Sequence, residues 1–156
     1  MPITKGFGMM NHTFDHYAPV VPGKVGGRHQ GVLVSMENGK ATTYGMMGVE
    51  DRGTLFVEPG TEVYEGMIVG ENTRDNDITV NITKQKQKTN IRSANKDQTN
   101  VIKKPRILTL EEALEYLSDD EYLEVTPESI RLRKQILDKG ERERVAKKKK
   151  FAELEN

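Results

Sequence analysis

Short apolar runs separated by turn residues dominate residues 31–82. The turns recur roughly every 8–12 positions, which is typical of a small sheet or barrel. The first two runs, joined by Asn38-Gly39, predict a hairpin, since this dipeptide readily adopts the positive φ of a tight turn. The pattern favours an α+β fold whose body is a small antiparallel β-barrel-like sheet. Strands are expected at residues 31–36, 41–47, 54–58, 62–70 and 77–82.

Residues 83–104 have no hydrophobic period and consist mainly of Lys, Gln, Asn and Thr. A polar segment of this length inside a compact domain predicts a long loop with a functional role or no fixed structure. The sequence therefore predicts a β body that carries one long basic loop.

A helical pattern follows the loop. Thr109 and Glu112 have the spacing of a capping box, and the helix of residues 110–117 is expected to bury apolar side chains on one face. The expected buried residues are Leu110, Ala113, Leu114 and Leu117. Residues 122–126 predict a strand. Residues 129–137 fit either a strand or a helix, and we favour a helix that begins after Thr126-Pro127.

Both ends of the chain differ from this body. Residues 4–17 alternate like a single strand, and residues 18–30 have the Pro and Gly content of a linker. Beyond Gly140 the chain is highly charged and weakly helical. The expected divisions are 1–18 (strand), 19–30 (linker), 31–138 (main domain) and 139–156 (charged tail).

Composition excludes some classes of protein. The chain has no cysteine, so disulfides and thiolate metal sites are excluded. No apolar run approaches the roughly 20 residues that span a membrane, and no signal-peptide pattern is present. We therefore expect a cytoplasmic protein without membrane contact.

The net charge of +0 hides a strong segregation of charge. Residues 84–104 carry a net charge of +6, residues 110–125 contain seven acids and no base, and residues 131–150 carry a net charge of +7. Two basic blocks predict a surface for a polyanion, because local potential rather than total charge attracts a partner. A merely solvated exterior is the alternative.

Catalytic motifs are weak. The pairs Gly23-Lys24 and Gly39-Lys40 are not followed by Ser or Thr, so no phosphate-binding loop is present and no catalytic residue is expected. His12 and His16 share a face, but a metal site needs three or four convergent ligands. We expect no metal and no cofactor in this chain.

The basic segments supply the candidate RNA-binding residues. Cations can meet phosphates, and the hydroxyl and amide side chains between them can bind ribose or bases. The candidates in the loop are Lys84, Lys86, Lys88, Thr89, Asn90, Arg92, Ser93 and Lys96, and those in the second block are Arg131, Arg133 and Lys134.

Several long stretches resemble the BipA/TypA family of translational GTPases. TKGFGMMNHTFDHY is similar to the last strand of an elongation-factor-G-like fifth domain. EDRGTLFVEPGTEVYEGMIVGE, KTNIRSA and LTLEEALEYLSDDEYLEVTPESIRLRKQIL resemble the C-terminal domain specific to that family. The resemblance covers residues 4–138, and the first of these three stretches is long and specific.

The resemblance implies a cytoplasmic parent that takes part in large-subunit assembly and in translation under stress. It implies contacts with the 70S ribosome, large-subunit rRNA and the acceptor end of the A-site tRNA, the last through a loop that corresponds to residues 84–100. The sites for GTP and Mg²⁺ would lie in a G domain that this chain lacks, so the chain itself would be no enzyme. A monomer is expected.

Two other function classes remain open. The acidic helix and basic tail could form a protein-interaction module that binds ribosomal proteins. A small His-dependent hydrolase built on His12 and His16 is the third possibility.

Overall fold

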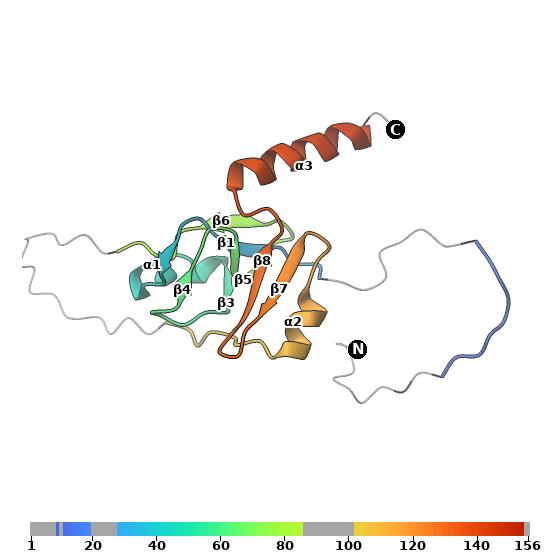
Figure 1. Cartoon of the computed structure of the whole chain (residues 1–156), viewed down its shortest axis with the longest axis horizontal. Coiled ribbons are helices and arrows are strands. Elements are labelled where there is room, and N and C mark those ends of the chain that lie inside the picture. Colours follow the sequence, from blue (N-terminus) through green and yellow to red (C-terminus); the bar gives the residue numbers. More distant parts are fainter. Residues whose placement is uncertain (1–8, 10, 20–27, 86–101, 155–156) are drawn as a thin grey trace, which may run out of the picture.

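The computed structural model describes residue 9 and residues 11–19, 28–85 and 102–154. Its main element is a six-stranded sheet of order β6-β1-β5-β8-β7, in which β3 also pairs with β5 (Figure 1). The strands are β1 (Val32–Ser35), β3 (Gly53–Leu55), β5 (Met67–Asn72), β6 (Ile78–Val80), β7 (Glu121–Val125) and β8 (Ile130–Lys134). A separate ribbon pairs β2 (Gly39–Lys40) with β4 (Glu62–Val63).

Strand β5 holds the sheet together. One of its edges pairs with β1, and the other is divided between β3, opposite residues 70–72, and β8, opposite residues 67–68. All pairings in this sheet are antiparallel except β1 with β6. The predicted α+β class with a mainly antiparallel sheet is confirmed. The predicted barrel is wrong, because the described strands form an open sheet.

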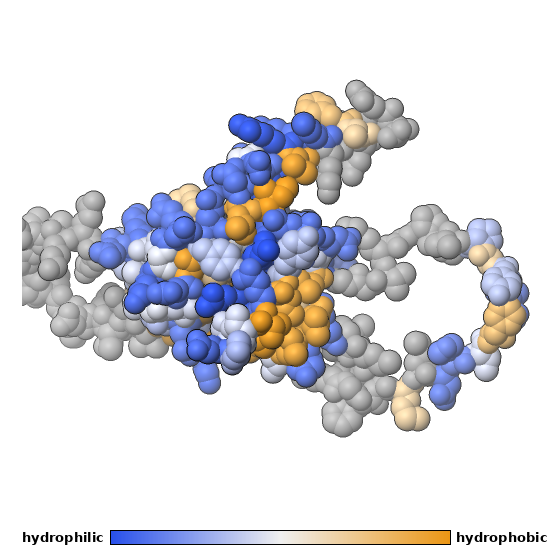
Figure 2. All heavy atoms as spheres, in the orientation of Figure 1, coloured by the Kyte–Doolittle hydropathy of each residue, from blue (hydrophilic) through white to orange (hydrophobic). Residues whose placement is uncertain are grey.

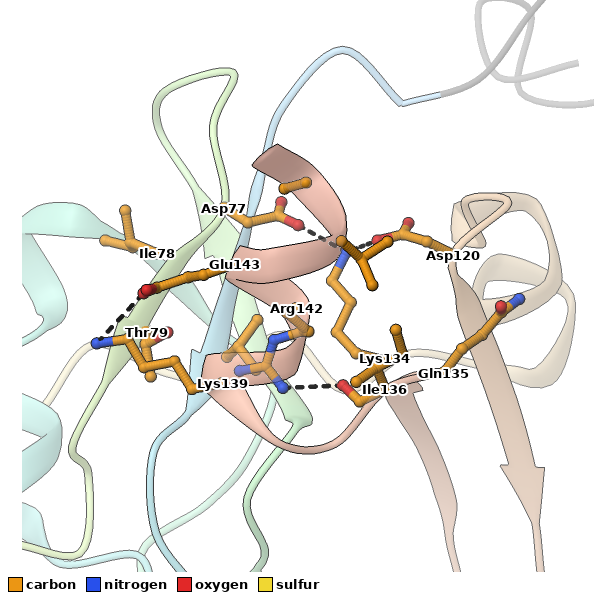
Figure 3. A pocket seen from close by; sticks show the side chains of 13 residues that line it. Asp77, Ile78, Thr79, Asp120, Lys134, Gln135, Ile136, Lys139, Arg142 and Glu143 are labelled. Carbon is orange, nitrogen blue, oxygen red and sulfur yellow. Dashed lines mark hydrogen bonds and ion pairs between the residues drawn. The ribbon is translucent and has the colours of Figure 1, made fainter. Parts of the chain in front are cut away.

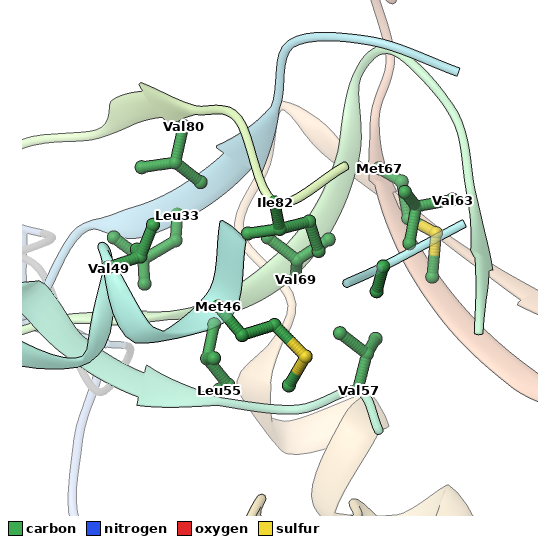
Figure 4. Close-up of a cluster of buried hydrophobic side chains, with 11 residues drawn as sticks. Leu33, Met46, Val49, Leu55, Val57, Val63, Met67, Val69, Val80 and Ile82 are labelled. Carbon is green, nitrogen blue, oxygen red and sulfur yellow. The ribbon is translucent and has the colours of Figure 1, made fainter. Parts of the chain in front are cut away.

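Hydrophobic side chains cover both faces of the sheet. In β1, Leu33 joins one buried cluster, whereas Val32 and Val34 join the other, as the two-residue period of a strand requires. The first cluster surrounds Met46 (Figure 4), and the second contains Phe56 packed edge-on against Tyr116. Strand β1 is therefore buried along its whole length.

The predicted hairpin of residues 31–47 is wrong. Residues 43–47 form a short helix, α1 (Thr43–Met47), whose N-cap Thr42 accepts a hydrogen bond from the Gly45 N–H at 3.0 Å. A Cβ at Gly45 would collide with the Ile82 carbonyl, so glycine allows α1 to lie directly against the end of the β6 segment. The Thr42 cap stabilises the start of this helix. The spacing of the apolar residues alone did not reveal the cap.

The predicted strand of residues 62–70 is divided in two. Gly66 adopts a φ of +86° and separates β4 from β5. The predicted strands 54–58 and 77–82 correspond to the shorter β3 and β6, and a 3-10 turn, η1 (Glu50–Arg52), precedes β3.

Helix α2 (Leu110–Tyr116) begins as predicted. The Thr109 hydroxyl oxygen accepts from the Glu112 N–H at 3.3 Å, and the Glu112 carboxylate accepts from the Thr109 N–H at 3.0 Å. The predicted buried face is only partly correct, since Ala113 is buried but Leu110 and Leu114 are 39% and 56% exposed. Figure 2 shows hydrophobic side chains gathered over α2.

The predicted helix at 129–137 is wrong, whereas the strand at 122–126 is confirmed as β7. The Thr126 N–H donates to the Ser129 carbonyl at 2.9 Å and closes a turn, so the chain returns as β8 in a hairpin with β7. Side chains of β8 alternate between its two faces, as in a strand: Leu132 and Lys134 are buried, and Arg131 and Arg133 lie on the other face.

Helix α3 (Lys139–Leu154) follows β8 and projects away from the sheet (Figure 1).

At the N-terminal end, residues 9 and 11–19 have no helix or strand and lie apart from the body. The strand expected over residues 4–17 is thus not formed by its described part. Within the described residues, no helix is long and apolar enough to cross a membrane.

Candidate nucleic-acid interface

The basic loop leaves the body beside α1. The Thr42 hydroxyl lies 2.5 Å from the Lys84 carbonyl, and the Thr42 N–H donates to the Ile82 carbonyl at 2.8 Å. The cap of α1 therefore also fixes the entrance of the loop. Lys84 is exposed and borders a cavity of about 640 Å³ together with Arg52.

The loop returns to the body beside η1. Ile102 packs against the first hydrophobic cluster, and the Lys103 N–H donates to the Glu50 carboxylate at 2.6 Å. The exposed Lys103 and Lys104 border a smaller cavity of about 290 Å³. Both ends of the basic segment are thus held by the core, with lysines at each end.

The remaining loop candidates lie outside the described residues. They are Lys86, Lys88, Thr89, Asn90, Arg92, Ser93 and Lys96. Their role in binding RNA stays a prediction.

Arg131 and Arg133 project from the same face of β8 and are partly exposed. Arg133 makes an ion pair with Glu124 at 2.6 Å, and its guanidinium lies 5.0 Å from the centre of the Tyr122 ring. The Tyr64 hydroxyl donates to the same Glu124 at 2.6 Å. Arg133 is therefore held in place while part of it faces solvent.

Lys134 is buried, and its side chain is only 3% exposed. Its ammonium lies 2.6 Å from Asp77, 2.8 Å from Asp120 and 2.9 Å from Glu121 (Figure 3 shows the first two). Three carboxylates compensate one cation, so this lysine joins β6 to the β7–β8 hairpin. It is not oriented towards an external phosphate.

Arg28 completes this buried ionic cluster. Its guanidinium makes two hydrogen bonds to Glu121, at 2.8 and 2.9 Å, and lies 4.6 Å from the centre of the Tyr116 ring. A bidentate pair is among the strongest side-chain contacts and fixes its geometry. The segment before β1 is thereby anchored to the start of β7.

Burial raises the pKa of Tyr64 and Tyr116, and the bond from Tyr64 to Glu124 adds to the effect. Burial would lower the pKa of Lys134, but hydrogen bonds to Asp120, Asp77 and Glu121 outweigh it and raise the value. All three groups thus keep their protons more tightly in the folded protein than in the unfolded chain.

We therefore expect alkaline pH to destabilise the fold. The unfolded chain releases these protons near pH 10. Their contribution to the free energy of unfolding is complete below that pH and is lost as pH rises towards the folded pKa values. Urea unfolding between pH 7 and 11 measures this, and Tyr64→Phe should weaken the pH dependence. A free energy of unfolding that rises above pH 10 would contradict the expectation.

Sequence reasoning missed Arg28 and Glu121. Glu121 belongs to an acidic run that suggests a solvated surface. The available signal was the alternation of β7, which places Glu121 on the same face as Leu123. A carboxylate that points into the core needs a compensating partner, and Arg28 and Lys134 compensate Glu121.

The histidines form no site. His12, His16 and His29 are exposed, and the His16 ring lies 2.7 Å from the Asp15 carboxylate. Among the described residues, no three metal-ligating side chains converge.

A comparison with known protein families identifies the family of the described domain. The model of the TypA/BipA C-terminal domain matches residues 30–139, which include every strand and both α1 and α2. The chain belongs to this family. Helix α3 begins where the match to the TypA/BipA C-terminal domain ends.

Curated relatives are similar across nearly the whole chain. A protein named large ribosomal subunit assembly factor BipA from Bacillus subtilis is 71% identical over 154 residues, which cover 99% of this chain and 25% of the relative. Proteins of the same name from Escherichia coli K12 and Synechocystis are 48% and 52% identical, over 92% and 85% of this chain and 24% and 22% of theirs. The chain thus spans about a quarter of the relatives' length.

Proposed function

We propose that this chain is the ribosome-contacting C-terminal module of a GTPase that acts in large-subunit assembly. The observation that carries the proposal is the family match over residues 30–139, together with relatives named for that assembly. Binding is assigned to RNA because residues 84–104, with a net charge of +6, are held at both ends by the body.

The anchoring of the loop supports this role. The two described ends of the loop are held by the body, one by the Thr42 hydroxyl at the Lys84 carbonyl and the other by the Glu50 carboxylate at the Lys103 N–H. Its cations reach phosphates beyond the body, and the polar residues between them offer hydrogen bonds to ribose and bases. We assign contacts to the loop candidates and to Arg131 and Arg133. We do not assign one to Lys134, whose three carboxylates occupy its ammonium.

Within the whole protein, this module would bring the GTPase to its RNA. The proposed partners are the 70S ribosome, large-subunit rRNA and the acceptor end of the A-site tRNA, reached by a monomer in the cytoplasm under stress conditions. GTP and Mg²⁺ would bind in a G domain elsewhere in the parent. The chain contributes binding and position rather than catalysis.

The chain by itself should neither bind nor hydrolyse GTP. No stretch of its sequence forms the glycine-rich loop with Lys and Ser or Thr that holds nucleotide phosphates. Equilibrium binding of a fluorescent GTP analogue measures this. Saturable binding in the micromolar range would contradict the expectation.

Co-sedimentation with ribosomes tests the proposal. The chain should pellet with 70S particles and with isolated large subunits, and added tRNA or large-subunit rRNA should compete. Steep loss of binding with salt identifies contacts to phosphate. Absence from the pellet at low salt, or binding only to ribosomal proteins with a weak salt dependence, would overturn RNA binding by this module.

A further inference from the structure

Helix α3 carries a cationic outer surface. Arg144, Lys147 and Lys148 have helical spacings of three and four residues, so they lie on one face, and Phe151 follows on the same face. Residues 144–150 contain five cations and no acid. Among the described residues, no carboxylate forms an ion pair with Arg144, Lys147 or Lys148.

The inner face of the helix is different. Lys139, Arg142, Glu143 and Ala146 line a cavity of about 550 Å³ between α3 and the sheet (Figure 3). They recur at helical spacings, so this face looks towards the body and the face of Arg144 and Lys148 is turned away. Arg144, Lys147 and Lys148 are therefore exposed to solvent and have no carboxylate ion pair among the described residues.

The base of α3 is fixed rather than hinged. The Asp138 carboxylate caps the first turn by accepting from the Glu141 N–H at 2.7 Å. The Arg142 guanidinium donates to the Ile136 carbonyl at 2.9 Å and to the Leu137 carbonyl, and the Lys139 N–H donates to Glu65 at 3.1 Å. A helix of 16 residues is about 24 Å long, so these contacts direct its cations well beyond the sheet.

Phe151 is the second observation that indicates a ligand. Phe151 is 68% exposed, and Lys147 and Lys148 precede it by four and three residues on the same face of the helix. Exposure of a large aromatic side chain among cations is costly in water but suits single-stranded nucleic acid, where a base stacks on the ring and the cations hold its phosphates. The positive charge of the helix and the exposed aromatic ring thus both favour a nucleic-acid partner.

We propose that the outer face of α3, formed by Arg144, Lys147, Lys148 and Phe151, is a second RNA-binding surface that acts independently of the loop. Its cations contact phosphates without reading sequence, and Phe151 stacks on an unpaired base. This inference rests on the proposed function, since it assumes that the chain meets RNA. It adds a site beyond the family-matched residues 30–139.

The test uses the full chain and a short RNA duplex, with and without one unpaired nucleotide. The arm variant replaces Arg144, Lys147 and Lys148 by Gln, which keeps helix propensity similar. The matched control replaces the exposed Lys40, Arg74 and Arg106 by Gln and removes the same charge from the body. Circular dichroism confirms that each variant keeps its helices.

The arm variant should flatten the slope of log affinity against log salt by roughly 3, at about 0.9 per phosphate contact on a duplex, whereas the control should keep the wild-type slope. Phe151→Ala should weaken binding roughly 5- to 100-fold, without changing the slope, only on the duplex with the unpaired nucleotide.

Other outcomes separate the two proposals. Equal slopes for the wild type, the arm variant and the control would overturn RNA binding by the outer face of α3. If a variant of the basic loop then reduced the slope, the proposed function would still stand. If the wild-type chain binds neither duplex nor ribosomes, both proposals fail. Tighter, arm-dependent binding to phosphatidylglycerol vesicles than to RNA would assign α3 to lipid and overturn the inference.

Discussion

Glu121→Ala should destabilise the fold by about 3–5 kcal/mol, the range for removing one partner of a buried ionic cluster. The Glu121 side chain is fully buried and compensates both Arg28 and Lys134. Its removal leaves a buried guanidinium without its bidentate partner and deprives the buried ammonium of one of three carboxylates. The cost arises from desolvated charge rather than from lost packing. Urea unfolding at pH 7 measures it.

Glu124→Ala is the matched control, because it makes the same substitution three residues later in β7. Glu124 is 37% exposed and pairs with the partly exposed Arg133 and with the Tyr64 hydroxyl, so its loss should cost about 1–2 kcal/mol, less than the loss of Glu121. Equal costs for the two variants would mean that the cluster around Glu121 contributes no more than a surface pair. An unchanged m-value would show that both proteins unfold between comparable states.

Leu33→Ala should cost about 2–5 kcal/mol, whereas Leu114→Ala should change stability by no more than about 0.5 kcal/mol. Leu33 is 0% exposed in the middle of the central sheet, and its removal leaves a cavity within the first cluster. Leu114 is 56% exposed on α2.

The pair distinguishes the observed packing from the face predicted by periodicity, which buried Leu114. Thermal or urea unfolding of both variants measures the difference. A cost for Leu114→Ala similar to that for Leu33→Ala would contradict the orientation of α2.

Sequence alone predicted the elements that local chemistry determines. The capping box of Thr109 and Glu112 predicted the start of α2, and short apolar runs between turn residues predicted the strands that correspond to β1, β6 and β7. The α+β class followed from these. The basic loop was recognised by composition, and the structure supports its position by placing Lys84 and Lys103 at anchored ends.

Long-range pairing determined what the sequence could not predict. Residues 41–47 have the apolar character of a strand, but the Thr42 cap and the contact of Gly45 with Ile82 form a helix. Residues 129–137 fit two periods, and pairing with β7 and β5 selected the strand.

Lys134 differs from the loop lysines only in its surroundings. Its carboxylate partners Asp77, Asp120 and Glu121 come from β7 and from turns far away in the sequence. A count of charges along the chain cannot show which cations are already paired. For the same reason the basic blocks predicted a polyanion surface but not the side chains that form it.

The most direct test of RNA contact through the loop replaces Lys84, Lys86, Lys88 and Arg92 together by Ala. Ribosome binding is measured by co-sedimentation at several salt concentrations, beside the control that replaces Lys40, Arg74 and Arg106. We predict weaker binding, a slope of log affinity against log salt that is flatter by roughly 3, and unchanged stability. Equal affinity and equal slope for the variant and the wild type would contradict RNA binding by the loop.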